Sequence, residues 1–460
     1  MIKLSAERRE GKMTAKRDID MTTGSILNHI ILFSLPLLIG NIFQQLYNMV
    51  DTWVVGNFVS NEAFSAVGTV GPVINMLIGF FSGLANGGGV VISQYYGAKR
   101  YDEVKRAVHS AILMTVALSI LLTMFGITVV PLVVRMMNTP AEVIPESTRY
   151  LSIYFSVLTG LLFYNMGAAI LRAVGDSRRP FYFLTVSAVL NIILDLYLVI
   201  RVKMGVAGVA WATIISQGIS ALLTMLVLFR TSSVVRLEFR SMKMDWDILK
   251  RIVRVGIPSA LQMAIVSFSN IFVQSYINHF GTDVMSGWSA YSKVDGLLWL
   301  PMQSVGMAVM TFVGQNLGRG QRDRAVEGVR MGLFTGLAIT GLCMIPIMIL
   351  APQTVAIFNS KPEVVQYGTL FLRMITPFAI MAVFSQIYAA ALRGSGNSKA
   401  PMIIMIFGYV VSRQIYLYVF SHFISNTIIP IGLGYPFGWV VVATLIIIYY
   451  HKVGIKGSII

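Results

Sequence analysis

The sequence predicts an all-α membrane protein with twelve transmembrane helices in two six-helix bundles that are related by an internal parallel repeat. Of its 460 residues 56% are hydrophobic and 12% are charged, so a soluble surface could not be covered with polar groups. Runs of about 20 apolar residues, the length that crosses a bilayer core of roughly 30 Å, recur along almost the whole chain. A set of motifs also occurs twice at nearly one spacing. Strands of a closed β-barrel would be shorter and would alternate apolar and polar residues.

Short polar breaks separate the apolar runs. We expect the twelve helices to begin near Ile26, Ala66, Ala107, Tyr150, Phe181, Gly208, Ile252, Gly287, Met331, Tyr367, Met402 and Phe437. The predicted organisation is a tail (1–25), a first lobe (26–229), a cytoplasmic linker (230–251), a second lobe (252–451) and a tail (452–460). The basic start of the chain is followed by no small-residue cleavage site, so we expect no cleaved signal peptide.

The basic residues follow the loops of this topology instead of forming one patch. The net charge of +16 by itself fits either nucleic-acid binding or a membrane protein. With the N-terminus in the cytoplasm, all but eight of the 36 Lys and Arg fall in the two tails and the cytoplasmic loops. The exceptions are Arg135, Arg149, Arg201, Lys203 and Lys361 on the other side, and Lys293, Arg373 and Arg413 within spans. We therefore expect a multi-pass protein of the cell (inner or plasma) membrane, with both termini cytoplasmic and no nucleic-acid partner.

Three motifs occur in both halves of the chain. LRAVGDSRRP at Leu171–Pro180 and LRGSGNSKAP at Leu392–Pro401 are 221 residues apart, and SQYYGAKRYDEVKRAV lies over GQNLGRGQRDRAVEGV at the same offset. SLPLLIG and VGIPSAL superpose Pro36 on Pro258 at an offset of 222. Because an even number of helices separates the copies, the halves share one orientation and are related by an axis along the membrane normal.

Two carboxylates lie inside predicted helices, where a charge costs roughly 2.5 to 3.5 kcal/mol on insertion scales. Each ends a polar stripe with three- or four-residue steps on one helix face. The first stripe is Asn41, Gln44, Gln45, Asn48 and Asp51, and the second is Ser187, Asn191 and Asp195. Such oxygen ligands suit sodium, and a desolvated carboxylate equally holds a proton. The alternative is that both carboxylates only solvate helix ends near the outer water boundary.

The second half keeps the scaffold without these carboxylates. At the repeat offsets the counterparts are Val273 for Asp51, Ser412 for Asn191 and Tyr416 for Asp195. Ion coupling is therefore expected in the first half.

Other intramembrane features have two interpretations each. Asp295 with Lys293, and Arg373 and Arg413, fit either a transport role or an internal ion pair and helix-end solvation. Pro36 and Pro258 fit either a hinge or a static kink. The 26 Met and many aromatic residues fit either an adaptable apolar cavity or core and lipid-facing positions; examples are Met49, Met166, Trp288, Tyr291 and Trp299.

No motif supports an enzyme. The chain has no P-loop, paired-His zinc motif or nucleophile elbow, and its five His are scattered. Cys343 is the single cysteine, which excludes a disulfide framework and a cysteine-based metal site. We expect no cofactor. A channel or membrane-embedded receptor would not need a carboxylate cluster confined to one half of a duplication, and uphill accumulation of substrate would distinguish it from a transporter.

The duplicated motifs, together with the YNMVDTWVVG stretch of helix 1, make the chain resemble the multidrug and toxic compound extrusion (MATE) transporters. This family lies within the larger group that includes polysaccharide and lipid flippases. The resemblance covers roughly Ile26–Tyr450 and rests on SLP and YNMVDTWVVG in helix 1, on SQYYG and GQNLG, and on the duplicated LRxxGxS turns. It implies two bundles that form a V around a central cleft and export cationic or amphiphilic compounds in exchange for sodium or protons.

The resemblance also implies roles for particular residues. It places a cation or proton site, which sodium could occupy, at Asp51, Asn191, Asp195 and Thr213. It further implies that three residues face the first-lobe cavity and that one proline bends helix 1 when the site is protonated; these are Gln44, Tyr47 and Asn165, and Pro36. One branch of the family has carboxylates in helices 7 and 10, but LQMAIVSFSNIFVQ and FAIMAVFSQIYAA carry none here, so a second-lobe sodium site is not expected.

The prediction that follows is a secondary active antiporter that exports cationic or amphiphilic drugs and toxic compounds by alternating access. Its expected partners are small-molecule substrates and membrane lipids, and we expect a monomer. The alternative is a flippase for a lipid-linked or amphiphilic cell-envelope precursor, which would call for more basic residues in the spans than the three found.

Overall fold

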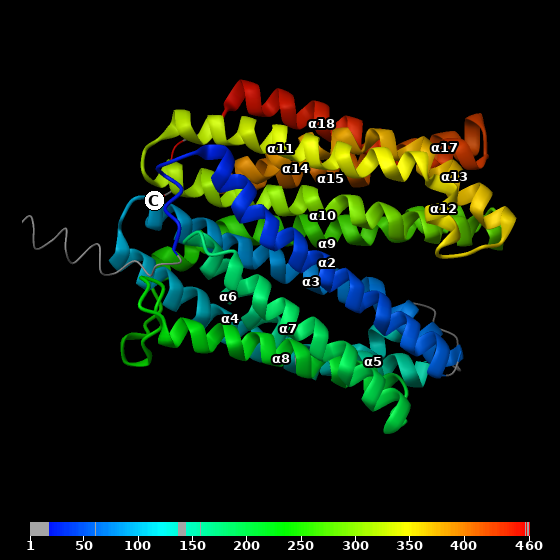
Figure 1. Cartoon of the computed structure of the whole chain (residues 1–460), viewed down its shortest axis with the longest axis horizontal. Helices are drawn as coiled ribbons and strands as arrows, with labels where there is room; N and C mark the ends of the chain where they lie inside the picture. Colours follow the sequence, from blue (N-terminus) through cyan, green and yellow to red (C-terminus); the bar gives the residue numbers. More distant parts are fainter. Residues whose placement is uncertain (1–17, 60, 137–143, 157, 456, 458–459) are drawn as a thin grey trace, which may run out of the picture. The chain divides into compact units, whose positions relative to one another are not determined.

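The computed structural model describes residues 18–59, 61–136, 144–156, 158–455, 457 and 460, and they fold almost entirely into helices (Figure 1). No strand occurs in this part of the chain, which agrees with the predicted all-α class. Residues 1–17 of the predicted N-terminal tail, and 456 and 458–459 of the C-terminal tail, lie outside the described residues.

The number of membrane spans agrees with the prediction. Eleven spans within the described residues are long and apolar enough to cross a membrane, and a twelfth forms if α5 (Ile144–Ser156) and α6 (Leu158–Ala173), bent by 47°, count as one. Several helices begin before the predicted residue. α4 (Tyr101–Met136) begins ahead of Ala107, because a helix continues past its apolar stretch into polar residues that hydropathy excludes.

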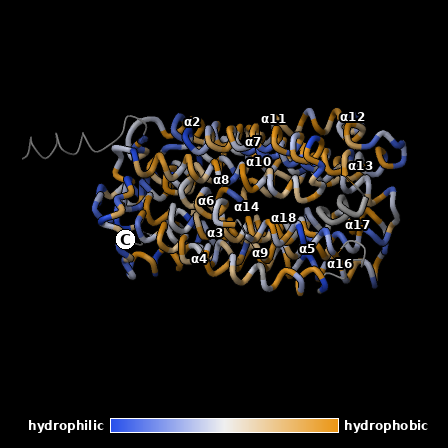
Figure 2. Tube along the Cα trace, turned by 90° about the horizontal axis from the view of Figure 1, so that it is seen from below, coloured by the Kyte–Doolittle hydropathy of each residue, from blue (hydrophilic) through white to orange (hydrophobic). Residues whose placement is uncertain are grey.

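Large apolar side chains face outward along the helices, as contact with lipid requires. Leu121, Met124 and Phe125 on α4 are 63%, 67% and 63% exposed, and Leu342 is 73% exposed. Figure 2 shows hydrophobic colour along the helices, with hydrophilic residues gathered mainly near their ends.

The chain divides into two compact units of helices. The first contains residues 18–20 and 39–257, and the second contains residues 21–38 and 258–455. The remaining helices of the first unit are α3 (Asn61–Gly97), α7 (Arg178–Asp195), the π-helix η1 (Leu196–Arg201), α8 (Val206–Arg230) and the 3-10 helix η2 (Phe239–Ser241). In this unit α8 packs on α6 and α7, and α3 packs on α6.

The second unit is built in the same way from more broken helices. Its elements are α10 (Thr282–Gly318), α11 (Arg322–Ile349), α12 (Ala351–Ala356), α13 (Pro362–Ile375), η3 (Thr376–Phe378), α14 (Ala379–Gly394), α15 (Lys399–Ile406), the π-helix η4 (Phe407–Ser412), α16 (Arg413–Val419), the π-helix η5 (Phe420–Ile424), α17 (Ile428–Gly432) and α18 (Gly434–Val453). α10 packs on α11, α13 and α14, and α14 packs on α18; these helices run side by side in Figure 1.

Two helices, α2 (Ile26–Phe58) and α9 (Trp246–Asn278), pass from one unit to the other close to a proline. The division falls between Leu38 and Ile39 in α2, just after Pro36, and immediately before Pro258 in α9. Proline removes one backbone hydrogen bond and permits a bend. The two repeat-related prolines therefore mark the places where the chain leaves one unit, although the hinge itself stays a prediction.

The predicted linker, 230–251, packs on the first unit. The backbone N–H of Asp245 donates to Ser110 Oγ at 3.0 Å, and Arg106 pairs with the Asp245 carboxylate at 3.1 Å. Asp245 Oδ1 also accepts the Ile248 N–H at 3.1 Å at the start of α9. These contacts attach the linker and the first turns of α9 to α4, so the compact first unit extends to Ile257.

The duplicated motifs adopt the same backbone geometry in both units. Gly175 and Gly396, 221 residues apart, have φ of 87° and 86°. Lys99 and Gly320, at the same offset, have φ of 58° and 78°. A positive φ is rare for residues with a Cβ, so its recurrence at matched positions supports the internal repeat in three dimensions.

Each copy of the LRxxGxS turn also starts the next helix with a polar side chain. Asp176 Oδ1 accepts the backbone N–H groups of Arg178 and Arg179 at 3.1 Å each. Asn397 Oδ1 accepts the Ala400 N–H at 3.3 Å in the second copy. Such bonds satisfy backbone N–H groups that the first turn of a helix leaves free. The motifs therefore start a helix, in addition to placing basic residues in a loop.

Within the second unit, the GQNLG motif holds the segment that precedes α2. The Met21 N–H donates to Gln315 Oε1 at 2.9 Å, and Asn316 Nδ2 donates to the Met21 carbonyl at 3.3 Å. Arg324 Nη2 donates to the Gly24 carbonyl at 2.8 Å. The segment is thereby fixed before α2 begins.

Candidate functional site

The polar residues predicted in helices 1, 5 and 6 come together in the first unit. Asp51 lies on α2, Asn191 and Asp195 lie on α7, and Thr213 lies on α8. The amide of Asn191 is oriented by its neighbours, as hydrogen-bond networks assign it. Its nitrogen donates to Asp51 Oδ1 at 2.8 Å, and its oxygen accepts the Thr213 backbone N–H at 3.3 Å. Asn191 therefore joins three helices at one point.

The two carboxyl groups face each other within hydrogen-bonding reach. Asp195 is fully buried at 0% exposure and Asn191 is 1% exposed, while Asp51 keeps some exposure. Neither oxygen of Asp195 has a donor among the described residues. Two negative charges at this separation repel strongly when water is excluded, and one proton or one cation between them relieves the repulsion.

Thr213 contributes differently from what its residue type suggests. Its hydroxyl donates to the Val209 carbonyl of its own helix at 3.0 Å, so the link to Asn191 runs through the backbone N–H. The hydroxyl oxygen keeps lone pairs that can accept or bind a cation.

A second polar group surrounds Tyr47 on α2. Gln217 Nε2 on α8 donates to the Tyr47 hydroxyl at 3.4 Å, and Gln44 also hydrogen-bonds that hydroxyl. Tyr47 is 6% exposed. Gln217 was not among the predicted site residues, although it follows Thr213 by one helical turn on the same face of α8, which is the signal that could have found it.

Tyr150, at the buried side of α5, is a further residue that the sequence did not single out. It is 6% exposed and lies close enough to Asp51 and Asp195 to interact electrostatically with both carboxylates. In the sequence Tyr150 stands near the start of an apolar run, where tyrosine is common in membrane proteins, so no local pattern identified it as a site residue.

Asn165, the third residue expected to face the cavity, lies elsewhere in the unit. Its Nδ2 donates to the Leu161 carbonyl at 2.9 Å, and its Oδ1 accepts from Ser82 Oγ at 3.3 Å. These bonds place it between α6 and α3. Its role in a substrate cavity stays a prediction.

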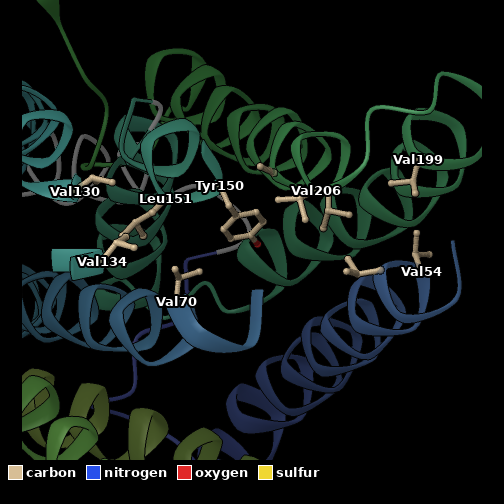
Figure 3. Close-up of a cluster of buried hydrophobic side chains, with 11 residues drawn as sticks. Val54, Val70, Val130, Val134, Tyr150, Leu151, Val199 and Val206 are labelled. Carbon is tan, nitrogen blue, oxygen red and sulfur yellow. The ribbon is translucent and has the colours of Figure 1, made fainter. Parts of the chain in front are cut away.

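An apolar cluster occupies the helical turn next to the carboxylates. It includes Val54 and Val55 on α2, Val199 on η1, and Val206 and Val209 on α8, each 3% exposed or less. Figure 3 shows Tyr150 lying among the valines of this cluster. The cluster excludes water from that end of the site, which strengthens every charge interaction within it.

The backbone changes form at Asp195. α7 ends there and η1 begins, and the Val202 N–H donates to the Tyr197 carbonyl, five residues back, at 3.1 Å. π-helical segments are rare and occur frequently at functional sites. Despite this local widening of the helix, no donor from the described part of the chain reaches the Asp195 carboxylate.

The repeat counterparts of the carboxylates in the second unit build no such site. Val273 is 0% exposed, and Ser412 Oγ donates to the Gly408 carbonyl of its own helix at 2.8 Å. The ring of Tyr416 stacks on Phe437 with centroids 4.7 Å apart. The asymmetry expected from the sequence is therefore present in three dimensions.

The other intramembrane charges do not form the ion pair that was one interpretation. Asp295 Oδ2 accepts the Trp299 Nε1–H at 3.0 Å, and Lys293 Nζ lies 5.4 Å from the centre of the Phe358 ring. Arg373 is exposed in the last turn of α13. Among the described residues no ion pair joins Lys293 to Asp295, and none includes the Arg413 guanidinium.

The described residues also include no cluster of three or more His, Cys, Asp or Glu side chains suited to a transition metal. The donor set of the first-unit site consists of carboxylate, amide and hydroxyl oxygens, which suits a hard monovalent cation or a proton.

A protein-family model described as MatE matches the chain twice, over residues 36–197 and 258–419. The two matches begin at Pro36 and Pro258, in agreement with the repeat register.

Multidrug resistance and export proteins are similar to this chain over most of its length. A probable multidrug resistance protein, YoeA of Bacillus subtilis (strain 168), is 31% identical over 443 residues, covering 95% of this chain and 96% of the relative. The multidrug export protein MepA of Staphylococcus aureus (strain MRSA252) is 22% identical over 381 residues, covering 82% of this chain and 84% of the relative.

Solved structures share the fold. One is described as the outward-facing conformation of a multidrug resistance MATE family transporter of the MOP superfamily; it has a TM-score of 0.89 and 25% identity, covering 95% of this chain and 98% of that one. A MOP superfamily transporter from Pyrococcus furiosus Vc1 (DSM3638) has a TM-score of 0.90 and 24% identity over the same shares. None of these descriptions favours the flippase interpretation.

Proposed function

Because this chain belongs to the MatE family, whose members are multi-span membrane transporters and not enzymes, we propose that it is a secondary active antiporter for cationic or amphiphilic drugs and toxic compounds. The counter-ion is a proton or sodium, and no cofactor takes part. The observation that carries the proposal is the buried contact between Asp51 and Asp195, joined by Asn191, in one unit only. We infer that a single chain performs the exchange from the plasma membrane, with both termini in the cytoplasm.

The charge state of this contact gives the coupling a physical cause. With both carboxylates ionised and no ion bound, repulsion opposes the packing of α2 on α7. Entry of a proton or sodium removes the repulsion and favours that packing. An ion therefore selects between two states of the protein, as a ligand with different affinities for them must.

α2 is suited to transmit the change between these two states because it passes from one unit to the other. Asp51 and Pro36 lie on the same helix, roughly 22 Å apart at 1.5 Å per residue. A change in how α2 packs near Asp51 is thus accommodated at the proline, where the helix lacks a hydrogen bond. Alternating access follows from the two states, and linkage requires drug and ion to affect each other's binding equally.

Gln44 and Tyr47, one or two turns before Asp51 on α2, are the proposed first contacts for substrate. An aromatic ring and an amide beside a carboxylate attract an amphiphilic cation. Tyr47 is also linked through Gln217 to α8, the helix that carries Thr213. Drug binding and ion binding would then both involve α2 and α8.

Reconstitution into liposomes tests the proposal. We would follow a fluorescent lipophilic cation under an imposed proton gradient and then under a sodium gradient. The expected result is uphill movement under one of the two gradients, which names the ion. Asp51→Asn should abolish that movement while the protein remains folded and inserted.

Asp295→Asn is the matched control because it removes another intramembrane carboxylate, which lies in the second unit. The amide oxygen of the asparagine can still accept the hydrogen bond from Trp299. It should keep gradient-driven movement. Wild-type movement in Asp51→Asn would refute the site assignment, and absence of movement under both gradients in the wild-type protein would turn the interpretation towards a lipid-linked substrate.

A further inference from the structure

Arg413, at the first residue of α16, is a buried guanidinium deep in a membrane helix. It is 3% exposed. Its Nη2 donates to Ser269 Oγ and to Asn270 Oδ1, both at 2.9 Å, and its guanidinium carbon lies 4.7 Å from the centre of the Tyr435 ring. These partners are neutral, and among the described residues no carboxylate forms an ion pair with the guanidinium, so oxygens and a π face hold the positive charge. A charge buried at such a cost needs a reason.

The position of Arg413 in the repeat supplies one. The offset of 222 carries Tyr47 and Asn48 of α2 onto Ser269 and Asn270 of α9. The offset of 221 carries α7 onto the run from α15 to α16, with Ile192 falling on Arg413. The helix pair that Asp51, Asn191 and Asp195 connect in the first unit is therefore connected by this guanidinium in the second.

Two local features strengthen the correspondence. A π-helical segment borders the charged residue in both units, since η1 starts directly after Asp195 and η4 ends directly before Arg413. Gln414 Nε2 also donates to Ser269 Oγ, at 3.3 Å. The ligands around Arg413 are hydroxyl and amide oxygens, the neutral kinds that hold a monovalent cation.

We propose that Arg413 is a tethered cation, which occupies in the second unit the place that the exchangeable ion takes in the first. This inference rests on the proposed antiport function and adds to it. The second unit carries its positive charge permanently, so its α9–α16 contact is held closed at any ion concentration. Only the first unit releases and rebinds an ion. Each chain thus has one exchangeable site, and ion dependence of transport should show no cooperativity.

Chemical rescue distinguishes a tethered cation from a side chain that only fills space. Arg413→Ala in nanodiscs should unfold at a lower temperature, because hydrogen bonds to a charged group are lost. In liposomes the variant should lose most of its gradient-driven drug uptake. Added guanidinium ion should restore both properties. Urea has nearly the same shape and hydrogen-bond donors but no charge, and it should restore neither. Arg373→Ala is the matched control because it removes an exposed arginine of the same unit, and it should respond to neither compound.

Equal effects of guanidinium and urea, or no rescue by guanidinium, would overturn the proposal. If Arg413→Ala does not fold, Arg413→Lys and Arg413→Gln replace it. Arg413→Lys keeps the positive charge and should keep transport, whereas Arg413→Gln should lose transport. Equal transport in these two variants would overturn the proposal. A Hill coefficient near two for the ion in the wild-type protein would also overturn it. Asp51→Asn, tested in parallel, separates this proposal from the proposed antiport site. Coupled transport in Asp51→Asn would refute the antiport site. Guanidinium rescue of Arg413→Ala would still test the tethered cation by itself.

Discussion

Asp195→Asn should make the ion-free protein more stable while destroying its function. The amide has nearly the same shape as the carboxylate and removes one of the two negative charges that face each other in the first unit. Asp195 is completely buried and has no donor among the described residues. The change therefore removes a repulsion without removing a described hydrogen bond.

The size of the effect follows from Coulomb's law. Two unit charges about 4 Å apart interact by about 4 kcal/mol at an effective dielectric constant of about 20. The neighbouring valines exclude water, so screening by salt is weak on that side. For a unit of roughly 200 residues each kcal/mol shifts the unfolding midpoint by about 2–4 °C. Removal of the full repulsion therefore corresponds to a rise in the unfolding midpoint of roughly 8–16 °C.

The assay is thermal unfolding of the purified protein in nanodiscs at alkaline pH without sodium, conditions that favour ionisation of both carboxylates. Under these conditions Asp195→Asn should unfold at a higher temperature than wild type. Acidification or added sodium, whichever is the counter-ion, should raise the wild-type midpoint and leave that of the variant nearly unchanged. A lower midpoint for the variant in ion-free buffer would refute the repulsion argument, and Asp295→Asn controls for the loss of any intramembrane carboxylate.

Three further changes test the site and two close backbone approaches elsewhere in the first unit. Asn191→Leu removes both bonds that join the three helices and should abolish coupled efflux and lower stability by about 1–3 kcal/mol, measured by transport and by thermal unfolding. Gly87→Ala places a Cβ 2.6 Å from the Gly256 backbone and should lower the unfolding midpoint and the yield of folded protein, whereas Gly218→Ala, with nothing within 4 Å, should not. Gly175→Ala combines a φ of 87° with a collision against a backbone carbonyl of the N-terminal segment, and should cost at least about 1–2 kcal/mol in the same assay; an unchanged midpoint in either glycine variant would contradict the described packing.

Sequence periodicity was sufficient to predict the carboxylate site because the polar residues lie on continuous helices. Three- and four-residue steps placed Asp51 at the end of one stripe and Asn191 and Asp195 in another, and the structure brings them together. The internal repeat was equally accessible, since its turns need residues at fixed positions. Gly175 and Gly396 share a positive φ that few other residues adopt.

Features that depend on tertiary contact could not be predicted in this way. Thr213 joins the site through its backbone N–H, which has no residue-type signature, and Gln217 depends on how α8 is rotated towards α2. The 47° bend between α5 and α6 interrupts a run that hydropathy reads as one span. The hydrogen-bond partners of Arg413, Ser269 and Asn270, lie on α9 and are 144 and 143 residues away in sequence.

The most direct test of the central claim measures ion release at equilibrium, without a membrane gradient. Drug would be added to the purified protein in weakly buffered, low-sodium solution, and released protons and sodium would be measured with a pH indicator and a sodium electrode. Competition between drug and ion through the Asp51–Asp195 contact predicts release of one ion per drug bound in the wild-type protein and none in Asp195→Asn. Drug binding without release, or equal release from the variant, would contradict the account.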